Sequence, residues 1–400
     1  MPAVVLSLFD TGLSVVRDLH HYGIRTYGVA LSLAEAGRRS RECTVIDSVS
    51  PQADSNALLQ TLNQIYDRER RTMVLFAGVD DATSFISRHR KQLDGKFLFS
   101  LPSEEVCETF GNKARQLERV RSLGIRVPRT VQFSRVTGYQ RGELGDFRFP
   151  AIIKPANAFA WNEHFSVKGF NVETRTRLDE ILREVELHGF DVLVQELVPG
   201  PLENLVEVSG FVDQQGVVRG RLVTMKNRTY PRDIGVGASI YTTRNAIAES
   251  IVQKIVDGVP IRGFFNVELK KRAATAEYEY IETNIRPWQQ VALGLPCGVP
   301  VVELAYRDAT GQDLPEPRTA PEGKRWIDPI RDYYSMVQNP EARAGDLFTW
   351  LRELATADAI TVFSLRDPMP GVQRLKFGRE LLSVASQTAK LMARLAKNRV

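Results

Sequence analysis

The chain has 400 residues, of which 43% are hydrophobic and 25% are charged, a composition typical of globular domains. This excludes a disordered, collagen-like or disulfide-scaffold chain, and the length allows two or three structural units. The net charge of +5 is unevenly placed: the last 30 residues hold seven basic side chains and one acidic one, a net +6, so the other 370 carry −1. The basic excess therefore belongs to the C-terminal tail.

The three cysteines, Cys43, Cys107 and Cys297, are scattered and form no CxxC pair. This pattern favours a reducing compartment, with each thiol a small core side chain. The N-terminus has no basic stretch and reaches Asp10 early, so we expect no secretory signal. No uncharged run is long enough to predict a membrane span. We therefore expect a cytoplasmic protein.

The first 127 residues predict a parallel sheet covered by helices on both faces, because apolar strands alternate with helical patterns. Gly12 and Gly78 directly follow two of these strands. In open α/β sheets ligands bind at such carboxyl ends of strands. Strands are expected at 3–8, 26–31, 43–46 and 72–76, and helices at 13–22 and 57–68.

The following part of the chain predicts a mixed α+β region. Two helices are expected within 104–123, and Pro128 marks a linker after them. Turn residues separate two pairs of apolar runs, which indicates two β-hairpins. Strands are expected at 149–154 and 192–197, hairpins at 206–212 with 217–225 and at 264–270 with 277–285, and helices at 178–188, 246–256 and 346–354.

The most informative segment is Glu282-Thr-Asn-Ile-Arg-Pro-Trp. Residues two apart on a strand share a face, so Glu282, Asn284 and Arg286 are expected to point the same way. A carboxylate and an amide oxygen suit Mg²⁺, and the guanidinium can bind phosphate or carboxylate. Glu268, on the other strand of the hairpin, can add a second carboxylate. An alternative remains open, in which Glu282 and Arg286 form a solvated ion pair on the sheet surface.

The chain resembles the ATP-grasp superfamily in the order of these elements, from about Val4 to about Gly311. It is most similar there to carboxylate–amine ligases of the D-aspartate ligase type. Three stretches carry the likeness to these ligases: residues 230–238 (YPRDIGVGA), 284–288 (NIRPW) and 306–311 (YRDATG). The likeness to the ATP-grasp superfamily rests on Lys113, Lys154, Gln195-Glu-Leu-Val, Glu207, Lys226-Asn-Arg228, Glu268 and the Glu282-x-Asn284-x-Arg286 element.

The resemblance implies an ATP-grasp fold that joins an α/β part to an α+β part. Residues 1–127 would form a Rossmann-like N-terminal domain with a parallel sheet. Residues 128–311 would form the ATP-grasp domain, with a lid subdomain at about 128–200 and a large subdomain at about 201–311. Residues 312–400 would form a helical C-terminal extension that ends in the basic tail.

The resemblance also implies a role for each matching residue. Lys113 and Lys154 would contact the phosphates of ATP, and Lys168 would add charge from the loop at 155–169, which holds a single glycine. Gln195, Glu196, Leu197 and Val198 would line the adenine site, and Glu207 would meet the ribose. Glu268, Glu282 and Asn284 would hold two Mg²⁺ ions, for which Mn²⁺ can substitute. Arg286, with Lys226 or Arg228, would neutralise the phosphoryl group in transfer.

The implied activity is an ATP-dependent ligation of a small-molecule carboxylate to an amine through an acyl phosphate. Two alternatives stay open: a D-aspartate ligase acting on a peptidoglycan precursor, and a protein that binds ATP without ligating. The sequence leaves the oligomeric state open, a homodimer included.

The C-terminal part carries no motif with assignable chemistry. Residues 363–370 are expected to form a linker, and apolar and basic side chains in the tail fall on opposite faces of an expected helix. That helix either packs on the body or lies on an anionic membrane surface through residues 379–400, at the inner face of the membrane. The lack of interleaved aromatic residues argues against nucleic-acid binding.

Overall fold

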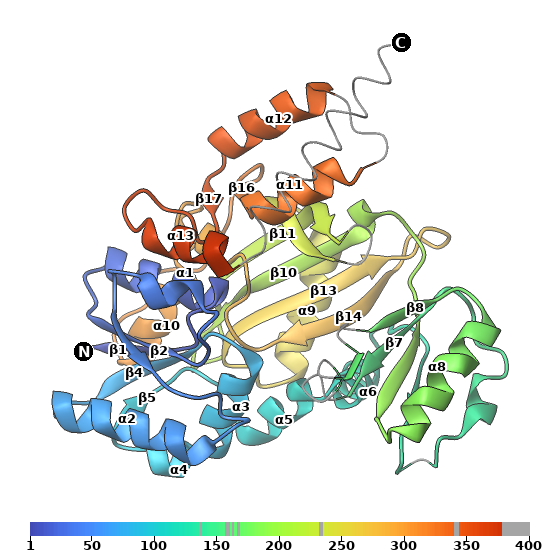
Figure 1. Cartoon of the computed structure of the whole chain (residues 1–400), viewed down its shortest axis with the longest axis horizontal. Helices are drawn as coiled ribbons and strands as arrows, with labels where there is room; N and C mark the ends of the chain where they lie inside the picture. Colours follow the sequence, from blue (N-terminus) through green and yellow to red (C-terminus); the bar gives the residue numbers. More distant parts are fainter. Residues whose placement is uncertain are drawn as a thin grey trace. The chain divides into compact units, whose positions relative to one another are not determined.

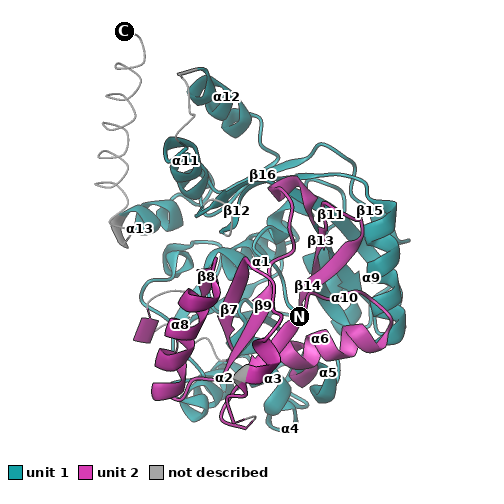
Figure 2. Ribbon diagram, turned by 90° about the vertical axis from the view of Figure 1, so that its right-hand side faces the viewer, with its two compact units in different colours: residues 1–107, 206–266, 284–400 teal, residues 108–205, 267–283 magenta. Residues whose placement is uncertain are grey.

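The computed structural model describes residues 1–136, 138–156, 161, 164–165, 169–231, 235–339 and 344–377 (Figure 1). The chain groups into two compact units by its internal contacts (Figure 2). Unit 1 comprises residues 1–107, 206–266 and 284–400, and unit 2 comprises residues 108–205 and 267–283. The three-domain division expected from the sequence stays a prediction. No described helix is long and apolar enough to cross a membrane.

Unit 1 begins with the expected parallel sheet, whose strand order is β3-β2-β1-β4-β5. The chain runs outward from β1 to β3 and then returns to the other side of β1, so the order reverses between β1 and β4. The strands are β1 (Ala3–Leu6), β2 (Thr26–Ala30), β3 (Thr44–Asp47), β4 (Met73–Ala77) and β5 (Phe97–Leu98). The helices are α1 (Asp10–His21), α2 (Ser55–Glu69), α3 (Asp80–Arg88) and α4 (Arg90–Leu93), with a 3-10 turn η1 (Ala36–Arg39).

Alternate residues of β1 belong to two different cores. Val5 packs in a cluster with Val16 of α1, whereas Val4 packs in a cluster with Leu62 of α2 and Phe85 of α3. This follows from the two-residue period of a strand, which sends successive side chains to opposite faces. Both faces of the parallel sheet are therefore covered, as the sequence predicted.

Close backbone packing explains the two glycines at the carboxyl ends of β1 and β4. A Cβ on Gly12 would lie 1.8 Å from the Ser7 carbonyl oxygen, and one on Gly78 would lie 2.9 Å from the Leu6 carbonyl oxygen. Gly78 also donates its N–H to that Leu6 oxygen at 2.8 Å. Only residues without a side chain fit here.

A second, eight-stranded sheet has the order β14-β13-β10-β11-β12-β16-β17, and β15 pairs with β11. Its strands are β10 (Leu205–Val212), β11 (Val218–Tyr230), β12 (Val236–Thr242), β13 (Gly263–Lys271), β14 (Tyr278–Asn284), β15 (Arg318–Thr319), β16 (Arg325–Ile327) and β17 (Ala359–Ile360). Both expected hairpins are confirmed as β10–β11 and β13–β14. The sequence analysis missed β12, whose Val-Gly-Ala-Ser start is weak as a strand signal.

The C-terminal extension adds β16 and β17 to this sheet. The other helices of unit 1 are α9 (Ala246–Gly258), α10 (Val301–Ala309), α11 (Pro329–Val337), α12 (Ala344–Ala355) and α13 (Met369–Phe377), with a 3-10 turn η4 (Val291–Leu293). The expected helix at 346–354 is thus confirmed as part of α12.

Residues 363–368 form no helix or strand, as expected of a linker, and α13 begins at Met369, but the segment is anchored to the body. Asp367 is buried, and its carboxylate accepts hydrogen bonds from Ser40 Oγ at 2.8 Å and from the Arg41 N–H at 3.1 Å. Arg17 Nη2 pairs with the same carboxylate at 3.2 Å. These contacts, with partners more than 300 positions away in the chain, hold the segment against the N-terminal part of unit 1. The tail at 378–400, including the expected amphipathic helix, lies outside the described residues.

Unit 2 contains a four-stranded antiparallel sheet in the order β6-β9-β7-β8. Helix α8 (Arg175–Leu187) packs its apolar face, with Leu178, Ile181 and Val185, into the core of this sheet. The strands are β6 (Thr130–Phe133), β7 (Ala151–Pro155), β8 (Phe170–Val172) and β9 (Val192–Glu196). Helices α5 (Glu104–Gly111) and α6 (Lys113–Ser122) precede them, and η2 (Arg141–Leu144) and η3 (Leu202–Asn204) are 3-10 turns.

Candidate functional site

Unit 2 brings together two of the expected lysines and two of the expected carboxylates. Lys154 lies in β7, Glu268 in β13 and Glu282 in β14, and Lys113 is the first residue of α6. Burial lowers the pKa of the Lys154 ammonium, and Lys113 lowers it further, whereas Glu282 and Glu268 raise it. Lys154 therefore feels the charges of the other three side chains.

Local interactions explain how the two lysines are positioned. The Asn112 side chain caps α6 by accepting from the N–H groups of Ala114 and Arg115, which fixes the helix start at Lys113. Gln116, one turn later, accepts from Tyr280 Oη at 2.8 Å and from the Thr283 N–H at 3.0 Å, so α6 is tied to β14.

The Lys154 ammonium donates to Gln195 Oε1 at 3.3 Å. Gln195 in turn donates through Nε2 to Thr130 Oγ1 at 3.0 Å. Because β7 and β9 pair in antiparallel register, with Ile152 opposite Gln195, the two side chains lie diagonally on one face of the sheet. One hydrogen bond to a neutral amide uses one of the three donors of an ammonium, so Lys154 keeps donors for an anion.

The segment expected at the adenine already uses two of its backbone donors. The Glu196 N–H donates to the Arg129 carbonyl at 2.9 Å, and the Leu197 N–H donates to the Pro150 carbonyl at 3.0 Å. Within the described parts of the chain, the Val198 N–H has no such partner. The Glu196 side chain accepts from the Arg148 N–H at 3.0 Å. Lys168 lies outside the described residues.

Unit 1 holds a buried ion pair between two other expected site residues. Lys226 Nζ lies 3.0 Å from Glu207 Oε1, and both side chains are at most 10% exposed. Asn266 Nδ2 donates to the other carboxylate oxygen of Glu207 at 3.5 Å. Neighbouring strands supply all three side chains, because β10 lies between β11 and β13.

Arg228 is held by two carboxylates from the C-terminal extension. Its Nε and Nη2 donate to the two oxygens of Asp332 at 2.6 and 2.8 Å, and Nη2 also meets Glu353 at 2.5 Å. Burial alone lowers the pKa of this guanidinium, but Asp332 and Glu353 raise it by more. This arrangement engages Arg228 in a network that the sequence analysis did not include.

Arg286 also makes a two-pronged ion pair. Its Nε and Nη2 donate to the two carboxylate oxygens of Asp80 at 2.7 and 2.8 Å. The Arg286 side chain is 19% exposed, whereas that of Asp80, the first residue of α3, is 69% exposed. Arg286 therefore has Asp80 as a counter-ion, a partner that the sequence analysis did not include.

The residues expected to hold metal offer two carboxylates and one amide. Asn284 ends β14, two positions after Glu282, and both side chains are partly buried. Among the described residues, no group of three or more His, Cys, Asp or Glu side chains is arranged to bind a metal ion. The donor set is one that suits Mg²⁺ bound partly through substrate phosphates, since this ion uses few protein carboxylates in such sites.

Comparison with known proteins supports the interpretation of these elements. No protein-family model matches the chain. D-aspartate ligase from Enterococcus faecium (strain Aus0004) is 24% identical over 294 residues, which are 66% of this chain and 69% of the relative.

Among solved structures, N5-carboxyaminoimidazole synthetase from Staphylococcus aureus complexed with ADP matches 81% of this chain and 80% of its own, with a TM-score of 0.62 and 12% identity. The chain has the ATP-grasp fold. L-amino acid ligase from Bacillus licheniformis matches 79% of this chain and 75% of its own, with a TM-score of 0.59 and 15% identity. Biotin carboxylase from Campylobacter jejuni matches 81% of this chain and 74% of its own, with a TM-score of 0.60 and 13% identity.

Proposed function

We propose that this ATP-grasp protein is an ATP-dependent ligase that joins a carboxylate to an amine. The observation that carries the proposal is the cluster of Lys113, Lys154, Glu268 and Glu282, in which one lysine and two carboxylates act on the buried ammonium of Lys154. A simple anion site needs no carboxylates, and a solvated ion pair on a sheet surface needs no buried lysine. An Mg²⁺-nucleotide needs carboxylates for the metal and cations for the phosphates. The likeness to D-aspartate ligase supports the same function.

In this proposal Lys113 and Lys154 bind the phosphates of ATP, and Glu268, Glu282 and Asn284 hold Mg²⁺. When bound, the metal neutralises phosphate charge, which lets an anionic carboxylate approach the nucleotide. Glu207 binds the ribose, because its oxygens keep acceptor capacity beside Lys226 and Asn266. Val198 supplies a backbone donor for the adenine edge.

The first chemical step transfers the γ-phosphoryl group. A substrate carboxylate oxygen attacks the γ-phosphorus, the bond to the β-γ bridging oxygen breaks, and ADP leaves with that oxygen. Arg286 and Lys226 neutralise the charge that gathers on the transferring group. Arg228 acts as a positioning residue for β11, because Asp332 and Glu353 already engage its guanidinium.

The second step forms the amide. The amine nitrogen attacks the carbonyl carbon of the acyl phosphate, the carbon–oxygen bond to phosphate breaks, and the nitrogen loses a proton. The relative at 24% identity makes D-aspartate, which carries both an amine and carboxylates, the first small-molecule substrate to test, with a peptidoglycan precursor as its partner. We place this reaction in the cytoplasm.

A screen for ADP release, with mass detection of the coupled product, tests the proposal. D-aspartate, L-aspartate and other D- and L-amino acids are offered as either substrate, each with a set of carboxylates and a set of amines as partners. The proposal predicts ADP and an amide product in equal amounts for at least one pair. ATP binding without ADP release for every pair would contradict it and would favour a protein that binds ATP without ligating.

A peripheral membrane contact of the tail is a separate proposal, supported by the net charge of +6 in the last 30 residues. Co-sedimentation with anionic vesicles tests it. Deletion of residues 379–400 is expected to abolish binding, and equal binding by the truncated protein would contradict the proposal.

A further inference from the structure

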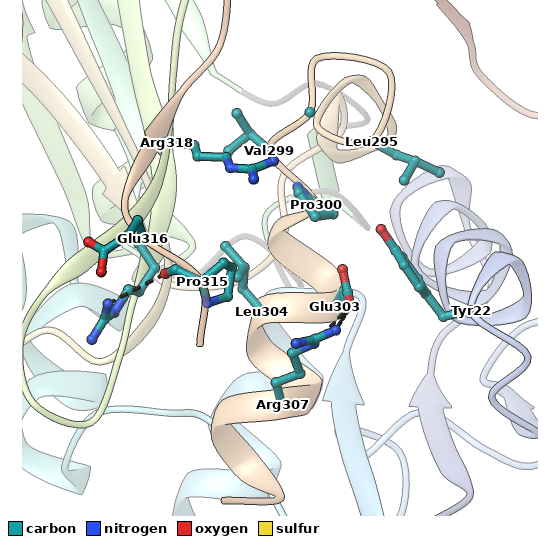
Figure 3. A pocket seen from close by; sticks show the side chains of 12 residues that line it. Tyr22, Leu295, Val299, Pro300, Glu303, Leu304, Arg307, Pro315, Glu316 and Arg318 are labelled. Carbon is teal, nitrogen blue, oxygen red and sulfur yellow. Dashed lines mark hydrogen bonds and ion pairs between the residues drawn. The ribbon is translucent and has the colours of Figure 1, made fainter. Parts of the chain in front are cut away.

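A cavity of about 300 Å³ lies in unit 1 beside the N-terminal half of α10 (Figure 3). None of the residues proposed to bind ATP, metal or the transferring phosphate lines it. Its volume is at the lower end of the range for small-molecule sites. The cavity therefore has the size for one small ligand, at a place that the ligase reaction does not use.

One wall carries a carboxylate and a hydroxyl that point toward one another. Figure 3 shows Tyr22, the residue that directly follows α1, opposite Glu303 of α10. Arg307 Nε donates to Glu303 Oε1 at 2.8 Å, and Nη2 lies 2.7 Å from the same oxygen. Burial raises the pKa of the Tyr22 phenol, as does its hydrogen bond to Glu303. The second oxygen of Glu303 keeps acceptor capacity.

The opposite wall carries Arg318, whose surroundings differ from those of the other arginines in the cavity. Three arginines line the cavity, and two of them have carboxylate partners: Arg307 pairs with Glu303, and Arg219 Nε lies 2.5 Å from Asp213 Oδ2. In the part of the chain that the structure describes, Arg318 has no ion pair. Its guanidinium extends toward Val299 (Figure 3).

Backbone pairing fixes where this side chain starts. Arg318 begins β15 and lies opposite Gly220 of β11 in parallel register. Between the two walls the lining is apolar: Leu295 and Pro300 are partly exposed, whereas Val299 and Leu304 are buried in the core. The cavity thus offers the Arg318 cation, an apolar surface and the Glu303 carboxylate, and Glu316 adds a second carboxylate to the lining.

We propose that this cavity binds a free amino acid with an apolar side chain. The Arg318 guanidinium binds its carboxylate, since a planar fork of donors matches a carboxylate in two-pronged geometry. The side chain packs on Leu295 and Pro300, and the ammonium faces Glu303. A ligand with only one charged end leaves the other wall of the cavity unused.

Calorimetry of free L-leucine binding to the full chain, in the absence of nucleotide, tests this site. Two comparison probes each lack one charged group: 4-methylpentanoate lacks the ammonium, and 3-methylbutylamine lacks the carboxylate. We expect L-leucine to bind tightest, the carboxylate more weakly and the amine not at all. The variant Arg318→Gln is expected to lose affinity for L-leucine by about tenfold or more.

Two further variants make the test specific. Arg366→Gln removes an exposed arginine that has no ion pair in the described structure and does not line the cavity, so it is expected to bind L-leucine like the wild type. Arg286→Met is expected to bind L-leucine unchanged, which separates this cavity from the proposed catalytic site. Equal affinity of Arg318→Gln and wild type, or no binding at about 10 mM, would overturn the proposal.

Discussion

Asp80 and Arg286 form a two-pronged ion pair at the carboxyl end of the parallel sheet, where strand order reverses. The two N–O distances are 2.7 and 2.8 Å, and Asp80 is the more exposed partner. An exposed ion pair is weak, about 0–1 kcal/mol, so an incoming anion can replace Asp80 at small cost. Asp80 is thus an internal counter-ion for an arginine proposed to bind a substrate carboxylate or phosphate.

We therefore predict that Asp80→Asn lowers the KM for the carboxylate substrate by about two- to fivefold, because the substrate no longer competes with Asp80. The value of kcat is expected to stay close to that of the wild type. Steady-state kinetics with the pair found in the ADP-release screen measure both. Asp81→Asn is the matched control, since Asp81 pairs with Gln52 instead. A higher KM in Asp80→Asn would contradict this role.

Lys154→Met is predicted to lower kcat/KM for ATP by about 100-fold, because it removes a charge aimed at the phosphates. The fold should be kept, since the hydrogen bond that the Lys154 ammonium donates to Gln195 is long, at 3.3 Å. Lys91 is an exposed residue of α4, so Lys91→Met is the control and should change neither kcat nor KM. Unchanged ATP kinetics in Lys154→Met would remove Lys154 from the nucleotide site.

Arg228→Met is predicted to destabilise the protein by about 3 kcal/mol, because it leaves the buried carboxylate of Asp332 without its cation. Urea denaturation measures the free energy of unfolding. Replacing both partners, Arg228→Met with Asp332→Leu, should recover much of this loss. If Arg228→Met is as stable as the wild type but inactive, Arg228 is catalytic and our assignment of a positioning role is wrong.

Glu35 predicts a pH dependence of stability. Its buried carboxylate accepts from Ser7 Oγ at 3.0 Å and from the Leu8 N–H at 2.5 Å, and it holds the turn where Ser7 has a φ of 72°. Burial raises the pKa of Glu35 to about 7, although these hydrogen bonds lower it. Ionisation therefore costs more in the folded state than in the unfolded state.

The contribution of Glu35 to stability is thus complete below the unfolded-state pKa of about 4.3 and is lost as pH rises to about 7. Relative to Glu35→Gln, which does not titrate, the wild type is expected to lose up to about 3 kcal/mol between about pH 4 and pH 8. Chemical denaturation of both proteins at both pH values measures this. If the difference in the free energy of unfolding between the wild type and Glu35→Gln is the same at both pH values, the prediction is refuted.

Local pattern was enough to predict the β13–β14 hairpin and the elements that carry Lys113, Lys154 and Glu282. Each lies in or beside a strand or helix whose own periodicity is strong. The partners of Arg228 and Arg286 could not be predicted, because Asp332 lies 104 positions from Arg228 and Asp80 lies 206 positions from Arg286. Such pairs depend on tertiary packing. The same reason explains why the anchoring of residues 363–370 could not be predicted, since Asp367 contacts Ser40 and Arg17, more than 300 positions away.

The most direct test of the proposed ligase site compares Glu282→Gln with Glu277→Gln. Both change a carboxylate in the β13–β14 hairpin to an amide, but Glu282 acts on Lys154, whereas Glu277 pairs with the exposed Arg126. The measurement is ADP release with the active substrate pair over a range of Mg²⁺ concentrations. We predict a loss of about 100-fold for Glu282→Gln and a wild-type rate for Glu277→Gln. A wild-type rate for Glu282→Gln at every Mg²⁺ concentration would contradict the proposed site.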